Sequence, residues 1–296
     1  MIDVARQRDG IFGRLESTEF DALVVGGGIV GTGIARDLAL RGLRVALVEQ
    51  HDLAAGTSSR PTRLIHGGLR YLEMFDFGLV RTDMREREVL LRLAPHLVQP
   101  LRFLMPMYAR GVFYRAKLQA GMQIYDVLSY DKSLPTRQWL NRRQTLRAEP
   151  GLNPVELQGA WQFYDGQVSL VERLVIENAL DAVSEGAVVA THAAAIDFLR
   201  DGAGTTITGA TVRDELSGRE ALVRARLTVN ATGPWLDVTT AGLRKGRRPL
   251  LRLTKGVHLV TPSATRNAHV LFAKLQARGA EAEANTHPGA GERDAG

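Results

Sequence analysis

A run of glycines followed by an acid has the spacing of a nucleotide-binding turn. In GGGIVG (residues 26–31), Gly26 permits a tight turn, Gly28 lets the backbone approach a pyrophosphate, and Gly31 lets a helix pack closely on a strand. Glu49 stands 23 residues after Gly26, where a carboxylate can accept hydrogen bonds from the hydroxyls of an adenosine ribose. The pattern predicts a dinucleotide site, and by itself it leaves FAD and NAD both open.

Residues 51–71 (HDLAAGTSSRPTRLIHGGLRY) form a second candidate segment. They are rich in glycine, serine and arginine, which disfavours a core strand and favours a loop that covers a ligand. Two histidines are candidates for chemistry, His66 in this segment and His258 near the end of the chain, because an imidazole side chain is a common general base. In such apolar surroundings, however, a histidine is more often packed or exposed than catalytic.

The elements around the glycine run supply the geometry that the site needs. Residues 22–25 form an apolar run before the glycines, a helical stretch follows to Arg41, and Gly42 stops it. A second apolar run, residues 45–48, leads to Glu49. This order of strand, turn, helix, strand and acid predicts phosphates at the helix N-terminus, where backbone N–H groups are free.

Helices and strands are expected through the rest of the chain. Residues 1–20 are predicted to be a short helical or irregular lead-in. Apolar spacing predicts helices at residues 77–93, 112–130, 137–149 and 170–185. Strands are expected at residues 100–108 (an edge), 159–168 (interrupted by a turn), 188–191, 196–199, 206–213, 222–229 and 250–262. The strands from 196 to 229 indicate an antiparallel meander inserted between two parts of a nucleotide domain. Residues 112–130 suit a core helix or a helix resting on lipid or a partner.

Composition narrows the class of protein. The 296 residues are 45% hydrophobic and carry a formal net charge of +6. The arginines are scattered, which argues against nucleic acid and leaves an anionic substrate or an anionic membrane surface. The absence of cysteine excludes disulfides, thiolate catalysis and cysteine-bound metal, and no metal is expected. Residues 1–20 do not have a signal-peptide pattern, and no apolar run is long enough for a membrane-spanning helix.

Longer blocks of the sequence resemble one known family. They are GGGIVGTGIARDLALRGLRVALVE, AAGTSSR, LIHGGLRYLE, FDFGLVRTDMREREVLLRLAPHLVQPLRFLMP, VNATGPWLD and RLTKGVHLV. In this order, over residues 18–262, they resemble the FAD-dependent respiratory glycerol-3-phosphate dehydrogenases, flavoproteins of the glucose-oxidase and D-amino-acid-oxidase type. The resemblance implies an α/β fold: a Rossmann-like FAD-binding domain with an incomplete antiparallel-sheet substrate domain.

The resemblance also implies that FAD is the cofactor. The pyrophosphate would lie at residues 26–31 and the ribose on Glu49, while residues 57–59 would donate hydrogen bonds to the phosphates and ribityl chain. The glycines after His66 would allow close approach to the flat flavin ring, and Ala195 would cap the adenine. The implied cofactor-binding residues are Gly26, Gly28, Ile29, Gly31, Glu49, Thr57, Ser58, Ser59, Leu64, His66, Gly67, Ala195, Thr232 and Gly233.

The implied reaction is oxidation of sn-glycerol 3-phosphate to dihydroxyacetone phosphate, with electrons passed through FAD to a membrane quinone. The resemblance places Arg70, Tyr71 and His258 at the active site. An arginine suits a phosphate ester because its fork pairs with two oxygens. His258 is the expected base, removing the hydroxyl proton while hydride leaves C2 for flavin N5. Trp235 is expected to serve packing only.

The sequence departs from the family in two places. The family's Ser-Ser-Lys is replaced by Pro61-Thr62-Arg63, which keeps a positive charge and loses a backbone donor at proline. No family segment is recognised after Pro262, although family members continue well past it. The predicted division is a lead-in at 1–17, an oxidoreductase domain at 18–263 and a disordered, low-complexity tail at 264–296. This predicts a C-terminally truncated or out-of-frame product with weak FAD binding and slow turnover.

Other interpretations remain open. A related flavin oxidase would pass electrons to oxygen, and a non-catalytic nucleotide-binding remnant would pass none. An NAD-dependent dehydrogenase fits less well, because GTSSR and HGGLRY would have no role in it. The expected location is cytoplasmic, with peripheral attachment to the inner face of the cytoplasmic membrane as an option. The oligomeric state stays open, with a homodimer among the options.

Overall fold

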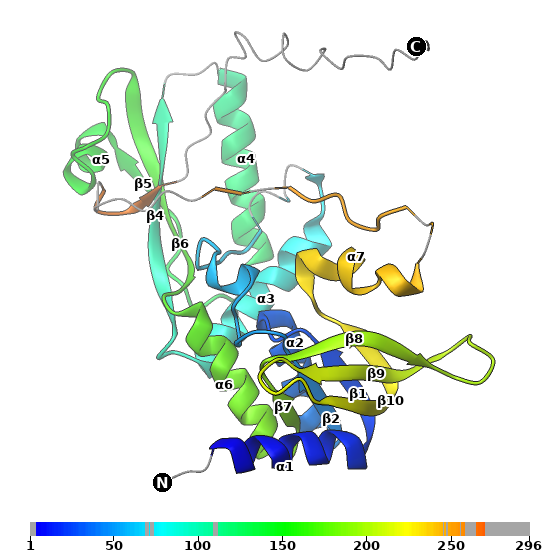
Figure 1. The fold of residues 1–296 in the computed structure, drawn as a ribbon. Helices are drawn as coiled ribbons and strands as arrows, with labels where there is room; N and C mark the ends of the chain where they lie inside the picture. The colour runs from blue at the N-terminus through cyan, green and yellow to red at the C-terminus, as the bar shows by residue number, and fades with distance from the viewer. Residues whose placement is uncertain are drawn as a thin grey trace, which may run out of the picture.

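The computed structural model describes residues 4–68, 71, 74–108, 112–244, 246, 248–254, 256–257 and 265–269. The chain forms a lower lobe around a six-stranded sheet and an upper lobe around a second, five-stranded sheet (Figure 1).

The six-stranded sheet joins a parallel half to an antiparallel half. Its order is β7 (Val188–Ala190), β2 (Val45–Val48), β1 (Glu19–Val25), β10 (Glu220–Asn230), β9 (Ile207–Asp214) and β8 (Ala193–Arg200). The first four strands are parallel, and β10, β9 and β8 form the antiparallel meander. The antiparallel meander expected between two parts of the nucleotide domain forms, and it is continuous with the parallel half of the sheet. The reason is the length of β10, whose first half pairs with β9 and whose second half pairs with β1.

Helices cover both faces of this sheet. They are α1 (Val4–Ser17) on one face and α2 (Ile29–Leu40) and α6 (Val171–Ser184) on the other. Neighbouring residues of a strand point to opposite faces. Leu23 therefore packs with Phe12 of α1, whereas Val24 packs with Ala35 of α2 and Ala182 of α6. The predicted lead-in is thus a helix that completes the core.

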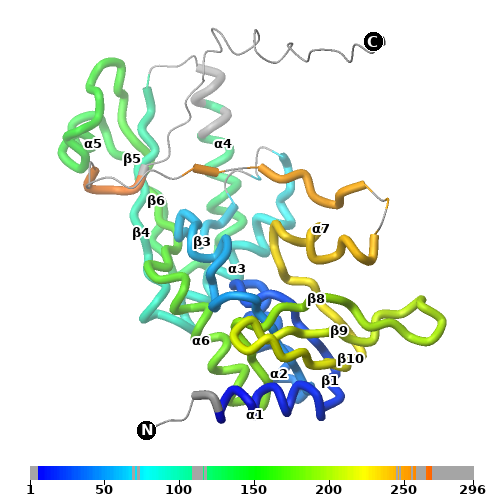
Figure 2. Tube along the Cα trace, in the orientation of Figure 1, coloured from blue at the N-terminus to red at the C-terminus, as the bar shows by residue number. Residues whose placement is uncertain are grey.

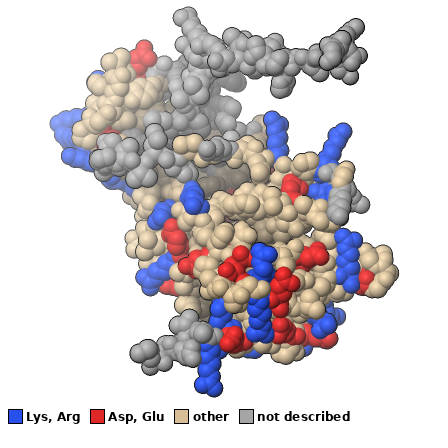
Figure 3. Space-filling view, viewed as in Figure 1, with Lys and Arg blue, Asp and Glu red and all other residues tan. Residues whose placement is uncertain are grey.

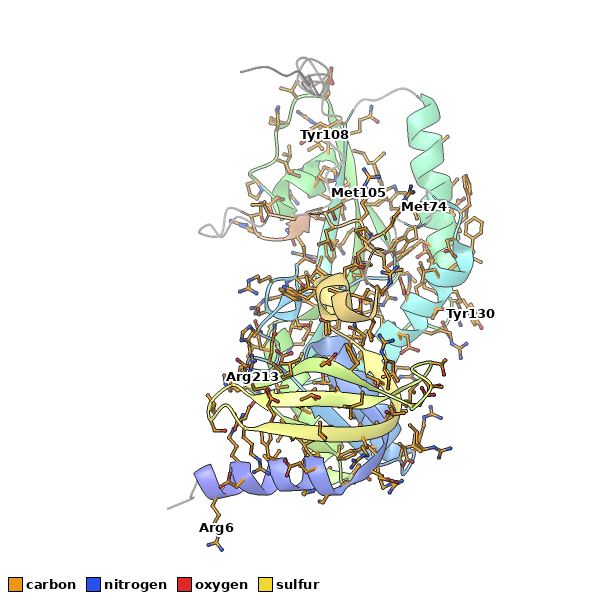
Figure 4. All side chains as sticks on the ribbon, turned by 45° about the vertical axis from the view of Figure 1, so that its right-hand side comes forward. Arg6, Met74, Met105, Tyr108, Tyr130 and Arg213 are labelled. Carbon is orange, nitrogen blue, oxygen red and sulfur yellow. The ribbon has the colours of Figure 1, made fainter. Side chains whose placement is uncertain are left out.

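The second sheet is built on a long antiparallel pair, β4 (Val98–Tyr108) and β6 (Leu157–Val168). The strands β3 (Leu64–Ile65) and β5 (Gln138–Asn141) add to β6, and β11 (Ala268–His269) adds to β4. The helices of this lobe are α3 (Phe77–Leu93), α4 (Val112–Leu128) and α5 (Arg142–Ala148). Met105 of β4 packs with Met122 of α4, between the sheet and the helix, and Met105 is labelled in Figure 4.

Two predicted elements of this lobe differ in the structure. The helix expected at 137–149 is divided into β5 and α5, because Trp139 pairs with Trp161 of β6 and Asn141 then starts a capping box with Gln144. The turn expected within 159–168 is absent, and β6 runs straight through Asp165, a buried residue whose carboxylate accepts hydrogen bonds.

The end of the described chain also differs from expectation. The strand predicted at 250–262 does not form at 250–254 or 256–257, which pass irregularly beyond α7 (Leu236–Thr239), as the orange trace of Figure 2 shows. Asp237 accepts hydrogen bonds from the backbone of Leu250 and Leu251 there, so those amides are directed to a side chain and not to a strand. Residues 265–269, placed by the sequence in a disordered tail, include β11. The rest of the predicted tail lies outside the described residues.

Short 3₁₀ turns occupy the loops that surround the glycine turn. They are η1 (Thr57–Ser59), η3 (Gly233–Trp235) and η4 (Ala241–Leu243). Among the described residues, no helix is both long enough and apolar enough to cross a membrane.

Candidate dinucleotide-binding site

The glycine turn has the geometry that its residue types predict. Gly26 has a φ of +114°, in the range that favours glycine, and a Cβ there would lie 2.6 Å from the carbonyl oxygen of Ala231. A Cβ on Gly31 would overlap the carbonyl oxygen of Gly26. Glycine at these two positions therefore allows α2 to start directly against the ends of β1 and β10.

The first turn of α2 points its amides at a surface lined by hydroxyls. Its N-cap residue, Gly28, carries no side chain to accept from these amides. The Ser58 hydroxyl of η1 accepts a hydrogen bond from the Ile29 amide at 2.9 Å. A Cβ on Gly28 would meet only this hydroxyl, at 3.1 Å. The other N-terminal amides of the helix, together with its dipole, favour an anion at this point.

Glu49 lies at the end of β2 and is tied to the glycine turn. Its Oε2 accepts a hydrogen bond from the Gly27 amide at 2.7 Å, and its Oε1 accepts from the His51 amide at 2.9 Å. A Cβ on Gly27 would lie 2.8 Å from the Glu49 Cβ. Gly27, which the sequence analysis gave no role, is therefore needed for the acid to reach the turn. Each carboxylate oxygen keeps a further lone pair for a ligand hydroxyl.

These elements enclose a cavity of about 630 Å³ at the carboxyl ends of the parallel strands, the usual ligand position in such sheets. Of the predicted cofactor residues, the cavity is lined by Gly26, Gly28, Ile29, Glu49, Thr57, Ser58, Ala195, Thr232 and Gly233. Gly31 and Ser59 support the wall without lining it. Five segments of the sequence thus meet at one cavity.

Other lining residues escaped the sequence analysis. Trp235, expected to serve packing only, lines the cavity and presses its ring on Gly56, where a Cβ would lie 2.9 Å from the ring. Arg60 also lines the cavity, and its Nη1 donates to the carbonyl oxygens of Ala55 and Gly56, which fixes this loop. In the sequence, Arg60 ends the TSSR block and Trp235 ends the TGPW block, and both blocks lie next to predicted cofactor residues.

The residues expected at the flavin ring form a separate group. Leu64, His66 and Gly67 do not line the cavity. His66 and Tyr71 lie together, with ring centroids 6.5 Å apart, and His66 Nδ1 accepts a hydrogen bond from the Gly68 amide at 3.1 Å. Arg70 and His258 lie outside the described residues.

Arg63, at the departure from the family sequence, is directed away from these groups. It has a φ of +60°, and its guanidinium donates to the backbone of Ser169 and to Glu172 of α6. The positive charge that this position retains is therefore paired on α6.

The fold and the cavity define an α/β protein with a cavity that suits a dinucleotide at the edge of a parallel sheet. Over residues 21–283 the sequence matches the family described as FAD dependent oxidoreductase. The chain belongs to this family, whose cofactor is FAD, as the sequence analysis predicts. The match also runs beyond residue 263, into the predicted tail.

Named relatives sharpen the family assignment. A glycerol-3-phosphate dehydrogenase of Synechocystis sp. is 43% identical over 258 residues, which cover 84% of this chain and 46% of the relative. An alpha-glycerophosphate oxidase of Streptococcus pyogenes is 40% identical, over 83% of this chain and 41% of the relative. A structure of the Bacillus halodurans glycerol-3-phosphate dehydrogenase complexed with FAD superposes with a TM-score of 0.62 at 30% identity, covering 80% of this chain and 39% of that one.

These comparisons confirm the predicted resemblance and the predicted fold class. The chain spans less than half the length of each of these proteins.

Proposed function

We propose that this chain binds FAD in the cavity at the ends of β1, β2 and β10 and serves the oxidation of sn-glycerol 3-phosphate to dihydroxyacetone phosphate. The observation that carries the proposal is the joined geometry of the glycine turn and Glu49, which fits the adenosine and pyrophosphate half of FAD. The relatives named for glycerol 3-phosphate chemistry support the choice of substrate.

Each part of the cavity suits one part of this cofactor. The N-terminus of α2 and the hydroxyls of Thr57 and Ser58 would hold the pyrophosphate. Glu49 would accept hydrogen bonds from the ribose hydroxyls while it keeps its bonds to Gly27 and His51. Ala195 in β8 would lie beside the adenine. Gly28 adds no side chain at this point of the turn, where the Ser58 hydroxyl already accepts a hydrogen bond from the Ile29 amide.

Bound FAD would supply the acceptor for the hydride from C2 of the substrate. The chain's own groups would bind the substrate and remove its proton. Arg70 would pair with the phosphate ester through two N–H groups, and Tyr71 would lie beside it. His258 would take the proton of the C2 hydroxyl, because a neutral imidazole is a suitable base near pH 7.

The proposal also concerns the electron acceptor, for which there are two candidates. A quinone is the acceptor implied by resemblance to the respiratory enzymes, whereas a relative named as an oxidase favours oxygen as the second candidate. Oxygen consumption measured against quinone reduction, with the same enzyme preparation, separates the two.

The reaction is tested by adding sn-glycerol 3-phosphate to the FAD-loaded protein without oxygen. The proposal expects bleaching of the visible flavin band, whereas sn-glycerol 1-phosphate should leave the band unchanged. His258→Asn should bind FAD as the wild type does and bleach at least about a hundredfold more slowly, the usual contribution of a general base. Saturation with FAD and no bleaching by the substrate would instead indicate a non-catalytic nucleotide-binding protein.

The proposal includes attachment to an anionic membrane surface. Lys and Arg side chains gather over α5 at the upper left of Figure 3. Arg142, Arg143 and Arg147 of α5 are exposed there. On α4, Val127 is exposed while Tyr125 on the opposite side is buried, so this helix is partly core and partly surface.

A further inference from the structure

A buried polar cluster lies directly beneath the segment that leads to His66. Asp165 of β6, Arg87 of α3 and Tyr125 of α4 meet there. Asp165 Oδ1 accepts a hydrogen bond from Arg87 Nη1 at 2.7 Å, and Arg87 Nη1 also donates to the Tyr125 hydroxyl at 3.2 Å. All three residues are buried, and Arg87 is completely so. The cluster therefore joins three elements that are far apart in the sequence.

Asp165 accepts from the amide of its own neighbour, Gly166, at 3.2 Å, and from the amide of Gly67 in a different part of the chain. The amide of Gly67 donates to both carboxylate oxygens of Asp165, at 3.1 and 3.2 Å. A Cβ on Gly67 would overlap the Tyr125 hydroxyl and lie 3.0 Å from Arg87 Nη1. Glycine at this position thus lets the backbone rest on the cluster, and the carboxylate fixes the direction of the peptide plane before Gly67.

The next residues continue this arrangement toward the surface. The Gly68 amide donates to Nδ1 of His66, so His66 in this state carries its proton on Nε2. His66 is exposed, and its ring neighbours that of Tyr71. The orientation of His66 is therefore coupled to the backbone of Gly67 and Gly68. Among the described residues, Asp165 is the one charged side chain that accepts a hydrogen bond from this backbone.

We propose that Asp165 is a positioning residue, which with Arg87 and Tyr125 fixes the His66–Gly68 backbone in the conformation that receives the flavin ring. The inference rests on the proposed function for the identity of the ligand, and on the contacts above for the fixed backbone. A charged acceptor holds an amide more strongly than a neutral one does. Because the cluster joins α3, α4 and β6 in the core, it also leaves the backbone of His66–Gly68 little freedom to rotate.

Some buried polar atoms of the cluster have no hydrogen-bond partner among the described residues. Nε and Nη2 of Arg87 have no hydrogen-bond partner among the described residues, and Nη2 lies 3.5 Å from Glu88 Oε1, which has none either. Burying charges with incomplete pairing is costly, and apolar residues of similar size are often at least as stable. Stability alone gives little reason for an arginine and an aspartate at this position.

The test compares Asp165→Asn with Asp214→Asn. Asp214 is a matched control, since it is also a buried carboxylate bound to an arginine, Arg8, but lies in the other lobe. Amide hydrogen exchange of the peptide that contains Gly67 is measured in both variants, along with the visible spectrum and the midpoint potential of bound FAD. The triple variant R87M/Y125F/D165L, which removes Asp165 and its charged partner Arg87 together, is measured in the same way.

Asp165→Asn should speed exchange at Gly67 by about tenfold, and the triple variant should speed it at least as much. Both should alter the flavin spectrum and potential, whereas Asp214→Asn should change neither. Wild-type exchange and a wild-type flavin spectrum in the triple variant would overturn the inference, as would equal changes in Asp214→Asn. A protein that takes up no FAD would contradict the proposed function, and the exchange rates would still decide the role of Asp165.

Discussion

At the scale of single residues, the site depends on where side chains are absent. Gly26 and Gly31 bring backbone into contact with backbone, and Gly27 makes room for Glu49. The same helix carries a glycine with no such constraint, because a Cβ on Gly33 would meet nothing within 4 Å. Gly31 and Gly33 therefore allow the need for close packing at Gly31 to be tested separately from the general effect of a glycine in a helix.

Gly31→Ala should weaken FAD binding and destabilise the fold by about 1–3 kcal/mol, because the added methyl group forces α2 away from the turn. Gly33→Ala should keep FAD affinity and stabilise the fold by up to about 1 kcal/mol, since alanine is the better helix former. Thermal unfolding and FAD titration of both variants measure this. Equal effects of the two substitutions would contradict the packing role of Gly31.

The sequence predicts these glycines and Glu49 because their spacing reflects local geometry within one strand, turn, helix and strand. It does not predict the partners that arrive from a distance. Trp235 reaches Gly56 across nearly 180 residues, and Asp165 reaches Gly67 from another sheet strand. A single sequence has no local pattern for contacts of this kind.

At the scale of elements, α1 is fixed to the meander by one arginine. Arg8 donates to Asp214 at 2.6 Å and to the backbone of Thr191 and His192, at the points where β7 and β9 end. Asp214 also accepts from Ser217 and the Leu216 amide. The Arg8 guanidinium, with these donors, holds the pKa of Asp214 well below its usual range. Phe12 and Leu15 of α1 pack on one face of the six-stranded sheet, so the Arg8–Asp214 pair helps to hold α1 on that face.

Arg8→Ala should lower the free energy of unfolding by about 1–3 kcal/mol, because Asp214 would remain buried without its charged donor. Arg41→Ala, which removes a pair exposed on α2, should change it little. Urea unfolding of both variants at pH 7 makes the comparison. Equal stability of wild type and Arg8→Ala would show that the tie contributes nothing.

The same pair predicts a pH dependence. The folded-state pKa of Asp214 lies below the unfolded value of about 4. The pair therefore contributes its full stability above pH 4, and this contribution is lost as the pH falls through the folded pKa. Below about pH 4, the difference in unfolding free energy between wild type and Asp214→Asn should shrink. A difference that stays constant from pH 7 to pH 3 would contradict this.

Element prediction succeeded where the pattern was local and failed where tertiary pairing decided. The helix expected at 77–93 matches α3 at both ends, helped by Asp76, whose side chain caps it. The segment at 138–141 has helical spacing but becomes β5, because β6 offers an edge for it to pair with. At 250–254 a β-like composition finds no strand partner among the described residues, and its backbone turns to Asp237 instead.

At the scale of the whole molecule, the surface charge is uneven. Acidic and basic side chains alternate over the lower lobe in Figure 3, whereas basic side chains dominate over α5. Clustered cations near an anionic bilayer attract it at short range, and salt weakens this attraction.

The charge-removing variant R142Q/R143Q/R147Q should therefore sediment less with phosphatidylserine vesicles than the wild type does. Wild-type binding should fall as salt is raised, and neutral vesicles should bind neither protein. As a control for loss of charge elsewhere, R213Q/R219Q/R224Q removes three arginines of the lower lobe. Equal vesicle binding by both triple variants would contradict a role for α5.

The cavity beside Glu49 is the proposed FAD site. It is tested most directly by titrating FAD with the purified, flavin-free protein and following the flavin fluorescence. The fluorescence change should saturate at one FAD per chain, and an excess of NAD should not affect it. An absence of saturable FAD binding, or displacement of FAD by NAD, would contradict it.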